Sequence, residues 1–408
     1  MAVTQVFGAR VRRREDPRLI RGTATYTDDV TLPGLCYAAF VRSPHAHARI
    51  RRVDTSRARS APGVLGVFTM QDLEGKVNPI PCGWQVPNCD LKTPPHPPLA
   101  RDKVRFVGDA VAVVVAESRA QAYDAAALVE VEYEVLPAVV DMEAALQSTT
   151  LVHEDVPHNR VLLWSVKGGD FEAAAREPGV RVVRQRLVNQ RLIPNAMETR
   201  AATAQYNPGT GELTLWVTSQ NPHIARVILS GVLSFPEHKL RVIAPEVGGG
   251  FGSKIPVYPE EAVVAHLATR LARPVKWAET RRENYLATIH GRDHITDAEM
   301  AVRPDGTVVG LRVRTLANFG AYLSTAAPAI PTILYGLVLS GPYRIPNIEC
   351  EVTGVFTNTT PTDAYRGAGR PEATYVLERM MDLAARELGL DPAEIRRRNL
   401  IPKDQFPY

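Results

Sequence analysis

One short segment of this chain combines glycines, an aromatic residue and a lysine in a way that suits binding chemistry. Residues 248–254 read GGGFGSK, directly after an apolar, strand-like segment at 240–247 and shortly before a helix-like one. Consecutive glycines let a backbone approach a ligand closely and turn its N–H groups toward an anion, and Lys254 adds a positive charge. The segment therefore predicts contact with a phosphate or pyrophosphate group.

Two commoner phosphate-binding motifs nearly match the same segment. The GxxxxGK[ST] loop requires a glycine where Ser253 stands and a hydroxyl where Ile255 stands, and the GxGxxG dinucleotide fingerprint also fails at Ser253. A glycine-rich turn without any ligand is a further interpretation. A nucleotide-binding protein thus stays open as an alternative, and it requires that the isolated chain bind ATP or NAD.

Two further segments carry polar groups beside glycine or proline. Residues 218–223 (TSQNPH) end a strand and contain Gln220, an amide that looks buried; taken alone, such a glutamine is more typical of a satisfied core or turn residue. Residues 363–371 (DAYRGAGRP) form a second glycine-flanked loop, with two arginines, before a helix. Taken alone, this loop is as consistent with a capped turn as with an anion site at a helix N-terminus.

The first part of the chain contains one clear strand-helix-strand pattern. A continuous apolar run at 111–116 predicts a buried strand, a capping pattern precedes a helix at 120–128, and alternating residues at 131–135 predict a half-buried strand. The segment 76–98 is rich in proline and asparagine and predicts a long loop.

The elements near the glycine and arginine segments are also visible in the sequence. Strands are predicted at 181–188 and 212–218, and a helix begins at Pro259, whose ring favours the first helical turn. Apolar residues at helical spacing, including two methionines, predict another helix at 373–388, which Gly389 ends. These elements would position the loops that follow or precede them.

Composition describes a globular chain. It has 408 residues, 45% hydrophobic residues and a net charge of +4 with scattered basic residues, which argues against nucleic-acid binding. No apolar stretch is long enough to span a membrane and no signal peptide is evident, so a cytoplasmic location is expected. The four cysteines have no iron-sulfur spacing, so any redox cofactor with thiolate ligands is expected on another chain.

The three loop segments, in this order, resemble those of the molybdopterin-binding large subunit of molybdenum hydroxylases, the xanthine dehydrogenase, aldehyde oxidase and carbon monoxide dehydrogenase family. The resemblance extends through residues 8–29, 103–137 and 389–401. It implies an α+β fold, with an α/β hammerhead-type domain, a linker and the first molybdenum-cofactor-binding domain. We place these parts at residues 1–140, 141–169 and 170–408 respectively, and the family's second cofactor-binding domain is expected to be absent from this chain.

The resemblance also assigns cofactor-binding residues. Gln220 would offer its amide to a ligand of the molybdenum, and Arg366 would contribute its main chain beside the metal. The glycine loop would pack its backbone against the cofactor through Gly249, Gly250, Phe251 and Gly252. The metal would be held by the pterin's sulfurs without a direct protein ligand, and the cofactor is expected in its cytosine dinucleotide form.

The implied reaction is the hydroxylation of an aldehyde or a nitrogen heterocycle with water as the oxygen source. Electrons would pass to a [2Fe-2S] cluster on a small subunit and to FAD on a medium subunit. The base glutamate is expected on the missing second half of the large subunit, so this chain would carry no catalytic residue of its own. We therefore expect the chain alone to be inactive, to expose a large apolar surface that includes the 373–388 helix, and to act in a heteromeric complex.

Some positions depart from the better-known family members. Gly367 stands where carbon monoxide dehydrogenases carry a copper-binding cysteine, and Ile255 and Ala368 replace the glutamate and the aromatic residue that purine-oxidising members use. With Tyr335, these residues are expected to line the substrate pocket. A carbon monoxide dehydrogenase-like large chain, and a non-catalytic fragment or assembly protein of the same fold, are the alternatives.

Overall fold

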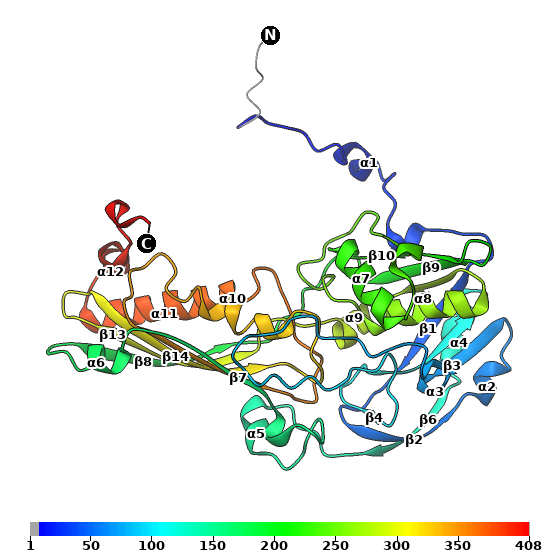
Figure 1. Cartoon of the computed structure of the whole chain (residues 1–408), viewed down its shortest axis with the longest axis horizontal. Helices are drawn as coiled ribbons and strands as arrows, with labels where there is room; N and C mark the ends of the chain where they lie inside the picture. Colours follow the sequence, from blue (N-terminus) through cyan, green and yellow to red (C-terminus); the bar gives the residue numbers. More distant parts are fainter. Residues whose placement is uncertain (1–7, 408) are drawn as a thin grey trace, which may run out of the picture.

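The computed structural model describes residues 8–407, whose named strands form three sheets (Figure 1). The largest has seven strands in the order β11-β10-β9-β12-β1-β5-β3, and a second has five in the order β7-β15-β14-β13-β8. The third is the small sheet β4-β2-β6. Helices and sheets are mixed along the chain, which confirms the predicted α+β class.

The seven-stranded sheet joins segments that lie far apart in the sequence. β1 pairs in parallel with β12 and antiparallel with β5. The two predicted domains therefore share one sheet, while their bounds stay a prediction. Its strands are β1 (Cys36–Arg42), β3 (Val64–Thr69), β5 (Ala110–Ala116), β9 (Ala201–Asn207), β10 (Glu212–Val217), β11 (Leu240–Ile243) and β12 (Val275–Ala278).

Continuous apolar sequence explains the centre of this sheet. Every residue of β5 is buried, as a strand covered on both faces must be. Helix α8 (Pro259–Leu271) packs on β9 and β12, and helix α4 (Arg119–Ala126) packs on β1 and β5. Helix α7 (Pro222–Val232) contacts β11 at the sheet's end. The small sheet consists of β2 (Ala48–Asp54), β4 (Lys103–Val104) and β6 (Glu130–Val135).

The five-stranded sheet is covered by the long C-terminal helix α11 (Arg370–Leu388), which lies along β13 and β8 in Figure 1. Met380 and Met381 are fully buried there. The expectation that the apolar face of this helix awaits a partner chain was therefore wrong, because the chain's own strands cover it. The sheet's strands are β7 (Arg160–Gly168), β8 (Arg181–Asn189), β13 (His294–Val302), β14 (Val308–Asn318) and β15 (Ile348–Val355).

The stretch 141–169, expected to be a linker, contains helix α5 (Met142–Gln147) and strand β7. β7 pairs with β15, and its Trp164 is buried in the core of the five-stranded sheet. The prolines and glycines of this stretch led to the prediction of a linker instead of a strand. They mark the turns that lead into and out of β7 rather than a structureless connection.

The remaining helices are short. An extended arm that carries α1 projects from the body of the molecule (Figure 1). None of the helices within residues 8–407 is long and apolar enough to cross a membrane. The short helices are α1 (Asp16–Ile20), α2 (Ser56–Arg59), α3 (Met70–Leu73), α6 (Phe171–Ala175), α9 (Arg281–Ala287), α10 (Ile333–Gly336) and α12 (Pro392–Asn399).

Candidate cofactor-binding loops

The glycine loop connects β11 to α8 and is held in a series of tight turns. Gly249, Phe251 and Gly252 have φ values of +96°, +54° and +104°, so the backbone there lies in the region that favours glycine. The N–H of Ser253 donates to the carbonyl oxygen of Gly250 at 3.0 Å. The N–H of Ile255 donates to the carbonyl oxygen of Gly252, also at 3.0 Å.

Two of these glycines are needed because other parts of the chain come very close. A Cβ on Gly250 would lie 2.3 Å from Oε1 of Gln220, and a Cβ on Gly252 would lie 2.0 Å from the carbonyl oxygen of Ala364. Neither distance is possible for a real side chain. The structure therefore brings together all three segments that the sequence singled out, and their contact is one physical reason for the glycines.

Gln220 is bound to the glycine loop through its side-chain oxygen. Its Oε1 accepts hydrogen bonds from the N–H of Gly252 at 2.9 Å and from the N–H of Lys254 at 3.4 Å. Its Nε2 has no partner within residues 8–407, and the residue is exposed. The expectation of a buried amide was wrong, because Gln220 is exposed where its oxygen joins the glycine loop.

Lys254 does not serve the loop as a free positive charge. It is only 2% exposed, and its Nζ donates to Oε2 of Glu198 at 2.8 Å and to the carbonyl oxygen of Glu198 at 3.0 Å. The same Oε2 accepts the N–H of Gly248 at 2.7 Å. Burial lowers the pKa of Lys254, and Glu198 opposes that shift. The interpretation of Lys254 as a positive charge that binds an anion was therefore wrong. Lys254 is buried and paired with Glu198, and this pair holds the glycine loop in place.

The arginine loop begins at the buried residue Asp363 and leads into α11. Arg366 is exposed; its N–H donates to the carbonyl oxygen of Phe251 at 2.8 Å, and its guanidinium lies 5.8 Å from the centre of the Phe251 ring. Gly367 and Gly369 have positive φ, as does Ala368 between them. Arg366 was expected to contribute its main chain beside the metal, and its main-chain N–H is already used to join the two loops.

A buried arginine supports this second loop from below. Arg292 donates to the carbonyl oxygens of Tyr365 and Arg366, each at 2.9 Å, and its guanidinium lies 4.8 Å from the centre of the Tyr365 ring. Its other partner is Glu372 in the first turn of α11, at 3.1 Å. Sequence reasoning found neither Arg292 nor Glu198, because each acts on a loop that is distant in sequence, and no local motif marks either residue.

The expected substrate-pocket residues do not all meet. Ile255 is half-buried beside the glycine loop, and Gly367 and Ala368 lie on the arginine loop near the surface. Tyr335, by contrast, is fully buried in the core of the five-stranded sheet, where its hydroxyl and Thr315 are 3.0 Å apart. Burial raises the pKa of Tyr335. Its hydroxyl is committed to the core and does not face the two loops as expected.

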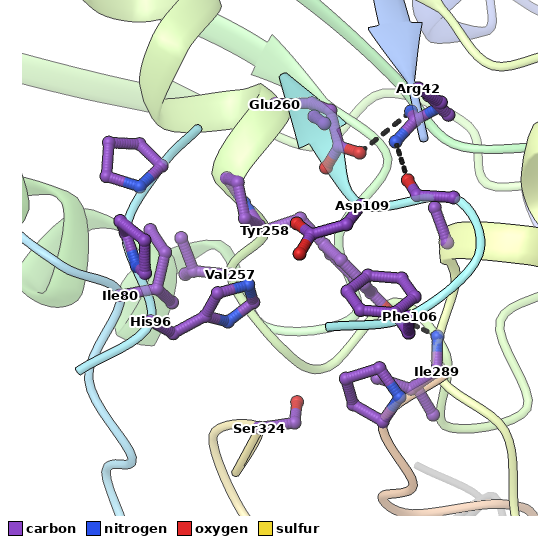
Figure 2. Close-up of a pocket in the computed structure, with 17 residues that line it drawn as sticks. Arg42, Ile80, His96, Phe106, Asp109, Val257, Tyr258, Glu260, Ile289 and Ser324 are labelled. Atoms are coloured by element: carbon purple, nitrogen blue, oxygen red, sulfur yellow. Dashed lines mark hydrogen bonds and ion pairs between the residues drawn. The ribbon is translucent and has the colours of Figure 1, made fainter. Parts of the chain in front are cut away.

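A buried charge network fixes the helix that follows the glycine loop. Arg200 is 1% exposed and donates to Glu260 of α8 at 3.0 Å and to Glu279 at 2.6 Å. Arg42 of β1 donates to the other oxygen of Glu260 at 2.8 Å, a contact drawn in Figure 2. The attraction to both arginines lowers the pKa of Glu260 to about 2 although burial opposes this, so the carboxylate remains charged. The glycine loop thus leads into a helix whose start is joined by ion pairs to β1 and to the residue that precedes β9.

Comparisons with known proteins agree with this arrangement. Residues 152–400 match the molybdopterin cofactor-binding domain, and residues 21–137 match the a/b hammerhead domain of aldehyde oxidase and xanthine dehydrogenase. The carbon monoxide dehydrogenase large chain of Hydrogenophaga pseudoflava is 38% identical over 97% of this chain and 50% of the relative. The crystal structure of quinoline 2-oxidoreductase from Pseudomonas putida 86 is 39% identical, with a TM-score of 0.92 over 98% of this chain and 50% of that one.

The chain spans about half the length of these relatives. Another relative is of similar length to the chain itself: the nicotinate dehydrogenase large molybdopterin subunit of Eubacterium barkeri is 31% identical over 96% of this chain and 88% of the relative. The family domains cover most of the chain, and the fold of a solved member overlies nearly all of it. The chain belongs to the molybdenum hydroxylase family, as part of its molybdopterin-binding large subunit.

Proposed function

We propose that this chain forms one wall of a molybdenum-cofactor site and that a second polypeptide, or a second half of the large subunit, forms the other. Together they would hydroxylate a small electron-poor substrate with water as the oxygen source. The observation that carries the proposal is the amide of Gln220. Its oxygen is bound to the glycine loop, while its Nε2 has no hydrogen-bond partner among residues 8–407, at the point where the three loops meet.

The residues at this point suit a pterin-bound metal. When bound, the cofactor supplies the redox chemistry, and its own sulfurs hold the metal, so the protein needs hydrogen-bond donors and shape rather than ligands. The loops offer the Nε2 of Gln220, which has no partner in the described part of the chain, and the ring of Phe251, which is 41% exposed. Lys254 lies behind the loop and would contribute to positioning only.

Exposed apolar side chains near the loops are consistent with a partner surface. Besides Phe251, several large apolar side chains are exposed on α7, which follows Gln220, on α11 and in the turn after α10, and a contiguous patch of such side chains would mark a surface that another chain covers. A relative of similar length that bears the name of a large molybdopterin subunit also supports a divided large subunit. The exposed residues are Ile224, Val227, Leu337, Val338 and Tyr375.

The electron path would require further subunits. The four cysteines of the chain are free, and they are buried or half-buried at separate places. We therefore propose a small subunit with [2Fe-2S] clusters and a medium subunit with FAD as the electron acceptors. We further propose a cofactor in the cytosine dinucleotide form and a cytoplasmic complex.

A nitrogen heterocycle is the substrate class that we favour over an aldehyde. Two of the relatives are named for quinoline and nicotinate, which are both nitrogen heterocycles. Ile255 and Ala368 offer neither the acid nor the aromatic ring expected for purine recognition. Gly367 offers no thiol for copper, so the carbon monoxide dehydrogenase alternative is disfavoured despite the similarity to such a chain.

The proposal is tested by purifying the chain from its host with whatever copurifies, and by measuring molybdenum, pterin and turnover of quinoline, nicotinate and benzaldehyde with an artificial electron acceptor. We expect molybdenum and pterin in equal amounts and hydroxylation of a heterocycle. Pterin-free protein, or a complex that holds molybdenum but oxidises none of these compounds while binding a maturation factor, would instead favour the assembly-protein alternative.

A further inference from the structure

A small, partly open cavity lies beside the segment that follows the glycine loop, between the turn that precedes β5, the long loop 76–98 and the start of α8 (Figure 2). Its volume is about 40 Å³. Because one water needs roughly 10 to 15 Å³ by this measure, the space suits about three or four water molecules. Most of its walls are apolar, including Ile80, Phe106, Val257 and Ile289.

One carboxyl group projects into this cavity. Asp109 is 6% exposed, and Figure 2 shows its carboxyl group turned toward the open space. Its Oδ2 accepts a hydrogen bond from the N–H of Arg105 at 3.0 Å. Its Oδ1 has no partner in the part of the chain that the structure describes. Asp109 is buried as a residue and lines the cavity, so a hydrogen-bond donor held in the cavity would stabilise this oxygen.

A histidine lies across the same space. The ring of His96 stacks on Tyr322 with centroids 4.1 Å apart, which fixes its orientation toward the cavity in Figure 2. His96 is half-buried, and neither of its ring nitrogens is hydrogen-bonded to another residue within 8–407. Burial lowers the pKa of His96 to about 4, so the ring is neutral near pH 7 and presents one donor and one acceptor.

The other polar groups that line the cavity are already engaged. Glu260 is paired with Arg42 and Arg200. The hydroxyl of Tyr258 donates to the carbonyl oxygen of Ser253 at 2.6 Å. The hydroxyl of Ser324 at the cavity wall is hydrogen-bonded to Asp363. Among the described residues that line the cavity, Asp109 and His96 are therefore the two with unused hydrogen-bonding capacity.

We propose that the cavity is a binding site for ordered water, which bridges Oδ1 of Asp109 to the imidazole of His96. The bridge connects the turn before β5 to the loop 76–98, and it lies against the segment that joins the glycine loop to α8. Asp109 and His96 thereby act as positioning residues for this junction. The inference rests on the cavity and its two unpartnered groups, and it holds whether or not the proposed reaction is correct.

The direct test is a crystal structure of the purified assembly that contains this chain, at a resolution that shows ordered water. We expect density for at least one water within 2.7 to 3.2 Å of Oδ1 of Asp109 and hydrogen-bonded, directly or through a second water, to His96. An empty cavity, a direct contact between the two side chains, or density for a larger organic molecule would each overturn the proposal.

Two substitutions at Asp109 provide an independent test. Asp109→Asn keeps the shape and one acceptor, so its crystal structure should retain the water; Asp109→Leu should displace it and lower the melting temperature more than Asp109→Asn does. Asp124→Leu on the exposed face of α4 is the control for replacing an aspartate by leucine. Retained water in Asp109→Leu, or a larger loss of melting temperature in Asp109→Asn, would contradict the assignment. If Asp109→Leu does not fold, the water in the wild type and in Asp109→Asn decides.

Discussion

The main-chain N–H of Arg366 donates a hydrogen bond of 2.8 Å to the carbonyl oxygen of Phe251. This bond joins the arginine loop to the glycine loop, and Gly252 lies against Ala364 beside it. The two loops therefore form one unit rather than two independent binding elements. A substitution in either loop should therefore alter the position of the other.

Gly252→Ala should separate the two loops. Its Cβ would lie 2.0 Å from the carbonyl oxygen of Ala364, and φ is +104°, so both contact and backbone strain oppose the substitution. Gly75→Ala is the matched control, since φ there is +70° and a Cβ would meet nothing within 4 Å. The control should lose about 1 kcal/mol of unfolding free energy and Gly252→Ala on the order of 3 kcal/mol or more. Equal losses in the two variants would show that the loops can move apart freely.

The two functions of the Gln220 side chain can be separated by Gln220→Glu. Glutamate keeps an oxygen that accepts the N–H of Gly252 but lacks the Nε2 donors. We expect near-normal stability and cofactor content, with turnover of the assembled enzyme reduced by an amount equivalent to about 2 to 4 kcal/mol. Gln220→Ala should lose stability as well as turnover. Wild-type turnover in Gln220→Glu would show that the amide donors do not act at the cofactor.

Lys254 and Glu198 should behave as a pair that fixes the loop. Glu198→Gln leaves a buried ammonium group without its carboxylate, and this should lower the unfolding free energy by about 3 kcal/mol. Adding Lys254→Met should restore most of that loss and leave the molybdenum content of the assembly close to normal. A double variant that is stable yet lacks cofactor would mean that Lys254 binds the cofactor's phosphate after all.

The buried carboxyl of Asp109 should make stability depend on pH. Burial raises its pKa from 3.8 to about 7, and the effects of Arg105 and Arg42, which lower it, do not cancel this. The folded state binds the proton more tightly than the unfolded state, so the contribution is complete below about pH 4 and is lost as pH rises through 7.

The comparison of wild type with Asp109→Asn isolates this effect from other titrating groups. Between pH 5 and pH 8 the wild type should lose unfolding free energy relative to the variant, within a limit of roughly 4 kcal/mol for the full shift. The nearby His96 is neutral throughout this range because its pKa is lowered to about 4, and Glu260 stays charged. Parallel stability curves for the two proteins would place the pKa of Asp109 near its ordinary value.

Elements with a strong local signal could be predicted from the sequence. The apolar run of β5, the proline at the start of α8 and the glycine that ends α11 each gave an element within a few residues of its observed bounds. The pairing of β1 with β12 could not be predicted in this way, because it depends on two segments at Cys36 and Val275 that meet only in the fold. The domain division drawn along the sequence consequently overlooked a shared sheet.

Contacts between residues that are distant in the sequence were also missed within the candidate site. The glycine loop, Gln220 and Arg366 were predicted as site residues because motif and resemblance mark them, and they lie in contact with one another. The pairing of Lys254 with Glu198 and the burial of Tyr335 depend on neighbours that are distant in the chain, so residue type alone suggested the wrong environment for Lys254 and Tyr335. Asp109 and His96 carried no motif at all.

The most direct test of the central claim, that this chain is one part of a molybdenum-cofactor site, is to express it alone and together with a candidate second half, in a host that makes the cofactor. Molybdenum per chain and oligomeric state are then measured for both preparations. We predict close to one molybdenum per chain in the joint complex and almost none in the chain alone, which should associate through its exposed apolar side chains. A monomeric chain that holds one molybdenum cofactor without any partner would contradict the account.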